Sequence, residues 1–200
     1  MADDWYRNHN WNSEIESQFF EKLSRSRSQR DQYLVIQALS LTSTFPEISI
    51  QLVSEFFKTR KDDFEDVRAL LAKTNALLNL NRIDEAIEAY RAVLKREEEF
   101  PKHQTTAYID YPYFVATHNI ESEYSNALSV LEKHFDRLMF PADCYKWYAA
   151  KALIENNSDY ASKALDAAEV KRSGFRFHQS IGLVGKEHAD TIERLCNIST

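Results

Sequence analysis

The chain has 200 residues, of which 44% are hydrophobic and 12% aromatic, so it can bury a sizeable core and is not disordered. Only 3 glycines and 4 prolines leave little turn chemistry for an all-β fold, and the sequence therefore predicts an all-α fold. The 25 basic and 31 acidic residues give a net charge of −6. This balance argues against a nucleic-acid partner, because phosphate contacts need a basic face.

The first helix is predicted near the N-terminus. Ser13 and Glu16 have the spacing of a capping box, which predicts a helix start at Ser13. Apolar side chains then follow at helical intervals: Ile15, Phe19 and Leu23. This helix should end near Ser26, and residues 1–27 are expected to form an N-terminal cap.

Large rings precede that helix in the segment Trp5-Tyr6-Arg7-Asn8-His9-Asn10-Trp11. Such rings provide binding area at little entropic cost, so the segment can line a pocket. A stack of helices also needs its open end covered. We favour this second role and expect Trp5 and Trp11 to fold back over the first helix.

Residues 28–171 are predicted to form about four helical hairpins. The best defined has helices at about 64–80 and 83–97, joined by Leu80-Asn81-Arg82. The other pairs are predicted from Tyr33 to Leu41 with a helix starting at Pro46, at 103–118 with 122–135, and at 141–155 with 158–171. Helices this short cannot bury both faces alone, so the antiparallel pairs are expected to stack into a curved α-solenoid. We expect residues 1–200 to form a single domain of this kind.

Residues 172–200 are predicted to form a C-terminal cap. The segment 175–181 lies between Gly174 and Gly182 and is expected to be extended. A last helix is predicted from about 186 to 197, since apolar residues share one of its faces.

The segment between these glycines combines basic and apolar side chains. Arg176, His178 and Lys186 can together hold an anion, which is the arrangement in the chain most similar to an enzyme site. The interpretation we favour is that they form a polar rim around apolar side chains that pack on the last helix, namely Phe175, Phe177 and Ile181.

The predicted hairpins repeat with a similar period. Small residues occupy matching places in the second helix of each pair, at intervals of 37, 41 and 34 residues: Ser49, Ala86, Ala127 and Ala161. The unit from Leu70 to Phe100 resembles a tetratricopeptide repeat, with Asn81 at the turn where that motif has Gly or another turn former. The fourth unit is similar, whereas the first and third are degenerate. The resemblance covers about residues 30–171.

This resemblance implies a concave groove, formed by the first helix of each pair, that holds an extended peptide or a partner's helix. In the best-known groove device, Lys, Arg and Asn side chains grip a C-terminal carboxylate. Candidate groove residues of this kind are Arg68, Asn75, Asn79 and Lys146. The alternative is that these are ordinary solvated side chains, because a full clamp should span several consecutive repeats.

The first helix of the third pair supplies further candidates. Pro112 should kink this helix, because proline cannot donate a backbone hydrogen bond. Polar and aromatic side chains surround the kink and are candidate groove residues: Tyr108, Asp110, Tyr111 and Tyr113. Packing inside the repeat is the competing interpretation.

Catalytic and metal-binding patterns are absent from the sequence. The six histidines form no HExxH spacing, and neither a glycine-rich phosphate loop nor GxSxG occurs. Cys144 and Cys196 form no CxxC pattern and are expected to be buried thiols. We predict no catalytic residues, no metal, no cofactor and no enzyme activity.

Three functional hypotheses remain. The first is a cytoplasmic, non-enzymatic interaction scaffold of the tetratricopeptide type that binds a protein or peptide. The alternative is an immunity-type or inhibitor protein that neutralises a basic partner through an acidic helical surface. The third is an enzyme or a small-molecule sensor with a pocket around Tyr111 and Tyr113. The N-terminus has no signal-peptide pattern and no apolar run approaches about 18 residues, so we expect no membrane partner.

Overall fold

The computed structural model describes residues 4–200, and this part of the chain forms ten α-helices, three short 3-10 helices and no β-strand. The all-α fold class is therefore confirmed, and consecutive helices pack in adjacent pairs. The chain divides into two compact units, residues 1–107 and 108–200. The single stack of four repeats stays a prediction.

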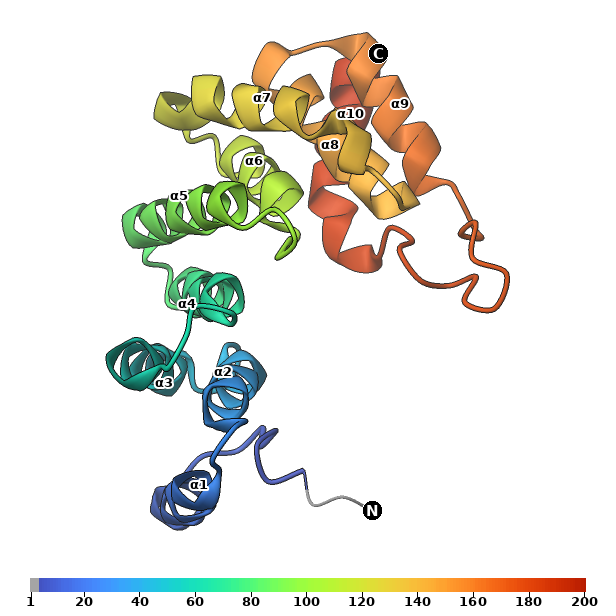
Figure 1. Ribbon diagram of the computed structural model, residues 1–200. Coiled ribbons are helices and arrows are strands. Elements are labelled where there is room, and N and C mark those ends of the chain that lie inside the picture. The colour runs from blue at the N-terminus through green and yellow to red at the C-terminus, as the bar shows by residue number, and fades with distance from the viewer. Residues whose placement is uncertain (1–3) are drawn as a thin grey trace. The chain divides into compact units, whose positions relative to one another are not determined.

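The first unit contains five helices (Figure 1): α1 (Ser13–Arg25), α2 (Arg30–Leu41), α3 (Pro46–Thr59), α4 (Asp66–Asn79) and α5 (Ile83–Glu99). Helices α2 to α5 each pack against the next, and α2 also contacts α4. Because the connections are short, neighbouring helices run antiparallel. Pro46 occupies the first turn of α3, as expected, since that position needs no backbone donor.

The second unit contains the remaining elements: α6 (Ala107–Thr117), η1 (Glu121–Glu123), α7 (Tyr124–Lys133), η2 (Phe135–Arg137), α8 (Pro141–Glu155), α9 (Ser158–Ala168), η3 (Lys186–His188) and α10 (Ala189–Ser199). Helix α8 packs against α7 and α9, and α10 packs against both α8 and α9. The predicted helix boundaries agree with these to within a few residues.

Three hairpins close with the same asparagine turn. Asn81, Asn119 and Asn156 follow α4, α6 and α8 with φ of 56°, 54° and 50°, the left-handed region that asparagine tolerates better than most residues. The amide after each asparagine bonds a carbonyl five residues back: Arg82 to Leu77 at 3.0 Å, Ile120 to Val115 at 3.0 Å and Asn157 to Ala152 at 3.2 Å. These are Schellman caps, so Asn81 is the turn former that the sequence predicted.

The small residues at matching places are all interior. Ser49, Ala86, Ala127 and Ala161 have no exposed surface. The Ser49 hydroxyl donates to the Ala38 carbonyl on α2 at 2.8 Å, so even the polar member is satisfied. Side chains this small let the two helices of a hairpin approach closely.

The N-terminal segment folds back on the first unit. The rings of Trp5 and Trp11 lie 5.5 and 5.6 Å from that of Phe19 on α1. Asn8 contacts Gln37 of α2, whose side chain is fully buried. The Gln37 side-chain nitrogen donates to the Asn8 backbone carbonyl at 2.8 Å, and the Gln37 side-chain oxygen accepts from the Asn8 backbone amide at 3.0 Å. The expected packing of both tryptophans over α1 is thus observed.

Two local predictions are wrong. The cap of α1 is Asn12 and not Ser13, because the Asn12 side chain accepts bonds from the first free amides of the helix. The segment 175–181 is not extended but forms consecutive turns, since backbone bonds such as His178 to Phe175 close it locally.

The expected burial of both thiols is also wrong. Cys144 is partly buried on α8, whereas Cys196 is exposed on α10.

Candidate functional site

One exposed face of α4 carries three of the predicted groove residues. Arg68 and Asn75 are partly exposed and Asn79 is exposed, whereas Ala69, Ala72 and Ala76 between them are fully buried. Spacings of seven and four residues put Arg68, Asn75 and Asn79 close to one line along the helix. This row is called the α4 face below.

The α4 face is partly organised by its own contacts. The Arg68 guanidinium donates to Glu65 at 2.7 Å, and the Asn79 amide donates to the Asn75 backbone carbonyl at 2.8 Å. Glu65 is only 4% exposed, so it holds the Arg68 guanidinium in place while 42% of the Arg68 side chain stays accessible. The α4 face therefore presents one oriented cation and two amides, groups that can bond carboxylates and peptide backbone.

Two tyrosines of α6 lie in the interior of the second unit. Tyr108 is 6% exposed and donates to the Arg137 carbonyl at 3.1 Å, and Tyr111 is 1% exposed and donates to Glu123 at 2.7 Å. Burial, reinforced by the nearby Asp143 charge, raises the pKa of Tyr108 to about 12. Both hydroxyls are used inside the unit, so these rings contribute to packing and do not line an open groove.

The other predicted residues of this unit come together between α6 and α8. Lys146 donates to Asp110 at 2.7 Å, and about a quarter of each side chain is exposed. The Lys146 ammonium also lies 5.9 Å from the centre of the Tyr113 ring. Sequence analysis placed Asp110, Tyr113 and Lys146 in one groove; the structure places them in one contact cluster.

Residues of η3 and α10 complete this cluster. The Tyr113 hydroxyl lies 2.8 Å from His188 Nδ1 and 3.0 Å from Thr191 Oγ1. Because the hydroxyl has one proton, it donates to one of these partners and accepts from the other. The Tyr145 ring is fully buried beside His188, at 5.1 Å between ring centres. We call the whole set the α6–α8–α10 cluster: Asp110, Tyr113, Tyr145, Lys146, His188 and Thr191.

Burial sets the protonation of the cluster. It lowers the pKa of His188, which is only 9% exposed, and the nearby Lys146 charge lowers it further. It also raises the pKa of the Tyr145 hydroxyl. A neutral imidazole can bond the Tyr113 hydroxyl without a buried charge, so these bonds join α6 to η3 and α10, and the buried Tyr145 ring of α8 packs beside them. The accessible part of the cluster is the Asp110–Lys146 ion pair.

Sequence analysis missed His188 and Thr191 as partners of Tyr113. They are separated from Tyr113 by 75 and 78 residues, so no local spacing connects them. The only available signal was that both lie at the start of the last predicted helix, where polar residues accompany an apolar face.

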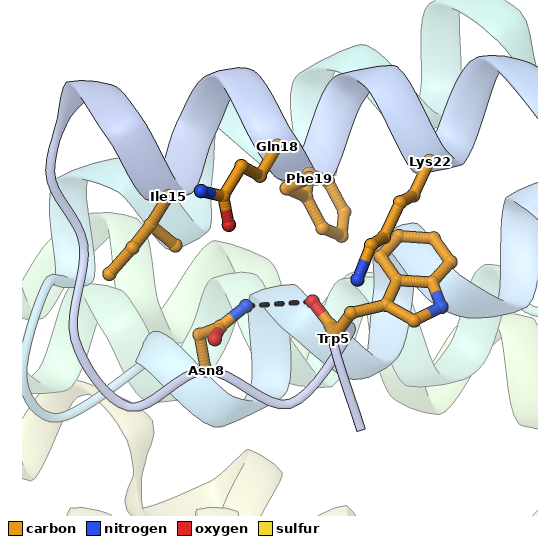
Figure 2. A pocket seen from close by; sticks show the side chains of 6 residues that line it. All are labelled: Trp5, Asn8, Ile15, Gln18, Phe19 and Lys22. Carbon is orange, nitrogen blue, oxygen red and sulfur yellow. Dashed lines mark hydrogen bonds between the residues drawn. The ribbon is translucent and has the colours of Figure 1, made fainter. Parts of the chain in front are cut away.

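A small pocket lies between the N-terminal segment and α1 (Figure 2). Its volume is about 100 Å³, and its lining comprises Trp5, Asn8, Ile15, Gln18, Phe19 and Lys22. The Asn8 amide crosses its base to donate to the Trp5 carbonyl at 2.7 Å. Ligand sites usually measure about 300 Å³ or more, so this pocket has room for a few waters only.

A larger hollow of about 400 Å³ is open to solvent and is lined by residues 60–63, before α4. Its charges are engaged locally: Arg60 pairs with Asp66, and Asp63 pairs with Arg96 at 2.9 Å. These ion pairs hold the α3–α4 connection against α4 and α5, so the charges stabilise the fold and are not available to a ligand.

Within residues 4–200, no three His, Cys, Asp or Glu side chains are grouped closely enough to hold a metal ion. In the same part of the chain, no helix combines the length and the apolar character needed to cross a membrane. Comparisons of the chain with protein-family models, with curated proteins and with solved structures found no match. Functional inference therefore rests on the residues and their geometry.

Proposed function

We propose that the protein is a non-enzymatic interaction scaffold of the tetratricopeptide-repeat type, working in the cytoplasm, and that it binds a peptide or protein along the α4 face. The observation that carries this proposal is the row of Arg68, Asn75 and Asn79, which stays accessible on a helix whose buried side is formed by small and apolar residues. Polar side chains in this position are available to a partner without disturbing the core.

The chemistry of the row fits a peptide backbone or terminus. Asparagine side chains carry both donors and acceptors, so they can pair with peptide groups, and a guanidinium can bond a carboxylate with two parallel donors. Arg68 is held by Glu65 and loses less side-chain entropy on binding than a free arginine would. In the second unit, the accessible Asp110–Lys146 pair is a separate candidate contact.

The inhibitor alternative is weaker because three acidic residues of α5, Glu85, Glu88 and Glu99, each pair with an arginine three residues away. Arg82 donates twice to Glu85, at 2.6 Å each, and Arg96 donates to Glu99 at 2.7 Å. Arg91 pairs with Glu88 in the same way. A surface that alternates charges like this gives little long-range attraction for a basic partner.

A selection experiment tests the α4 face directly. A phage-displayed library of random peptides is selected on the wild-type protein and counter-selected on the Arg68→Ala/Asn75→Ala/Asn79→Ala variant. The matched control is Glu88→Ala/Arg91→Ala, which removes an exposed ion pair from α5. Circular dichroism and melting temperatures verify that all three proteins are folded.

We expect peptides that bind the wild type and the α5 control alike, and that bind the α4 variant at least about tenfold more weakly, a loss typical of two or three hydrogen bonds. Peptides that bind all three proteins equally would show that the α4 face is not the site. A selection that enriches no peptide on the folded wild type would contradict the scaffold proposal.

A further inference from the structure

The segment that follows α9 and reaches the first residue of η3 differs in charge from the rest of the chain. Residues 171–186 contain four of the 25 basic residues and none of the 31 acidic ones: Lys171, Arg172, Arg176 and Lys186. The protein as a whole has a net charge of −6, so this loop is a local positive region on an acidic molecule. We call residues 171–186 the C-terminal loop.

Large apolar side chains are exposed on this loop. Phe177 is 82% exposed, Ile181 50% and Phe175 43%. Met139, which is 71% exposed, precedes Phe140, and the Phe140 ring stacks on Phe175 at 5.1 Å. The prediction that these rings pack on the last helix is therefore wrong, because local turns hold them at the surface.

The C-terminal loop is closed by its own hydrogen bonds. The Ser173 amide donates to the Gln179 carbonyl at 2.8 Å, and the Ser173 hydroxyl donates to the His178 carbonyl at 3.0 Å. The loop is also fastened to α8, where the Ala142 amide donates to the Gly182 carbonyl at 2.9 Å. Figure 1 shows the loop extending away from α8, α9 and α10. Its tip, residues 174–178, is thus presented in a fixed conformation.

We propose that the C-terminal loop is a membrane-contact site that binds the surface of a bilayer containing anionic phospholipids. Exposed phenylalanine and isoleucine side chains can enter the boundary between headgroups and acyl chains, while lysine and arginine remain at the level of the phosphates. Each cation near an anionic surface strengthens binding by about fivefold. This contact involves the surface alone, so it does not require the long apolar run whose absence led sequence analysis to expect no membrane partner.

Two features favour a lipid surface over other polyanions. Phe140 stacks on one face of Phe175, and the Arg176 guanidinium lies 5.3 Å from the Phe177 ring centre, so each ring offers at most one face to a nucleic-acid base. The aliphatic side chain of Ile181 also has no role in base stacking. A projecting loop suits a deformable interface, whereas an acidic protein partner would have to provide a matching pocket.

The negative charge of the neighbouring helices does not prevent this contact. At an ionic strength of about 0.15 M, charges are screened over about 8 Å. The loop extends away from α8, α9 and α10, so an anionic surface experiences the basic loop more strongly than the acidic residues of these three helices.

Co-sedimentation with vesicles tests the proposal, using phosphatidylcholine vesicles with and without phosphatidylserine. The loop variants are Phe177→Ser and Lys171→Glu/Arg172→Glu. Phe64→Ser is the matched control for an exposed ring, since Phe64 is 62% exposed and lies in the first unit. Lys95→Glu on α5 is the control for charge reversal. All substituted side chains are exposed, and circular dichroism verifies folding.

The wild type and both controls should sediment with phosphatidylserine vesicles and not with phosphatidylcholine alone. We expect Phe177→Ser to weaken this binding by about fivefold or more, the charge reversal to weaken it further, and added salt to release the wild type. The Arg68→Ala/Asn75→Ala/Asn79→Ala variant should bind vesicles normally, which separates this proposal from the scaffold function.

Two results would overturn the proposal. One is that wild type fails to bind phosphatidylserine vesicles at about 0.15 M ionic strength. The other is that the loop variants and controls bind equally well. A loop-dependent binding of a single-stranded oligonucleotide or of polyglutamate in the absence of vesicle binding would assign the loop to a different class of partner.

Discussion

Helix α6 and the C-terminal loop both carry large rings, yet they use them in opposite ways. In α6, the hydroxyls of Tyr108, Tyr111 and Tyr113 all bond partners within the unit. In the C-terminal loop, Phe175 and Phe177 are exposed among cations. The difference shows that the number of aromatic side chains in a segment does not by itself predict whether they pack in the core or are exposed to a partner.

Polar partners explain the contrast. A tyrosine can be buried at little cost when its hydroxyl finds an acceptor, and α6 faces η1, η2 and η3, which supply one each. The loop instead closes on itself through backbone bonds at Ser173, and no helix covers its tip in the described part of the unit. A segment that bonds neighbouring elements thus buries its rings, whereas a segment whose bonds close on itself leaves its rings exposed to solvent.

Substitution of matched rings should give the largest difference between the two regions. Tyr111→Ala should cost about 3–5 kcal/mol of unfolding free energy, because it leaves a cavity and removes a donor to Glu123. Phe177→Ala should change it by less than about 0.5 kcal/mol. Urea denaturation measures both. Equal losses in the two variants would mean that Phe177 is as well packed as Tyr111.

A second test asks whether the small interior residues are as constrained as the rings of α6. Ala86 has no exposed surface in the α4–α5 hairpin, so Ala86→Leu should overpack it and cost about 1–3 kcal/mol. The melting temperature should fall accordingly. The control is Ala142→Leu at the partly exposed start of α8, where added volume can extend into solvent. An unchanged melting temperature for Ala86→Leu would count against this helix pairing.

The hydroxyl of Tyr113 should contribute less than a whole ring. Tyr113→Phe keeps the ring but removes the bonds to His188 and Thr191, which should cost about 1 kcal/mol. Tyr6→Phe is a suitable control, because Tyr6 is partly exposed and its ring stacks on Tyr33 without depending on the hydroxyl. If both substitutions proved neutral, the α6–α8–α10 cluster would not stabilise the second unit.

The smallest expected effect concerns pH. Burial, aided by Lys146, lowers the pKa of His188 below its usual 6.5, while Glu187 and Asp110 oppose the shift. The unfolded chain therefore takes up a proton near pH 6.5 that the folded chain does not, and stability should fall as the pH is lowered through this value. Unfolding free energies at pH 7.5 and about 5.5 should differ more in the wild type than in His188→Gln. Identical differences would show that His188 is not buried in its neutral form.

The hairpins could be predicted from the sequence because their signals are local. Apolar periodicity and the Leu80-Asn81-Arg82 turn predicted helices at 64–80 and 83–97, and the structure has them at Asp66–Asn79 and Ile83–Glu99. The four small residues at matching places were also recognised, and all are buried. These features depend on neighbours within a few turns of helix.

The candidate sites were only partly predictable, because they depend on distant contacts. The row on α4 follows from helical spacing alone, whereas the link from Tyr113 to His188 spans 75 residues. The buried Gln37 side chain likewise depends on Asn8, which bonds it from 29 residues away. The exposure of Phe177 had no periodic signal either, since turns carry no alternation of buried and exposed positions.

Hydroxyl-radical footprinting with a mass-spectrometric readout would most directly test the central claim that α6 uses its rings for packing and the C-terminal loop presents its rings to a partner. The account predicts rapid labelling of Phe177 and protection of Tyr111, followed by loss of Phe177 labelling when phosphatidylserine vesicles are added. Labelling of Tyr111 at the rate of Phe177 would contradict the division between the two regions. Labelling of Phe177 that bound vesicles leave unchanged would contradict the contact role of the loop.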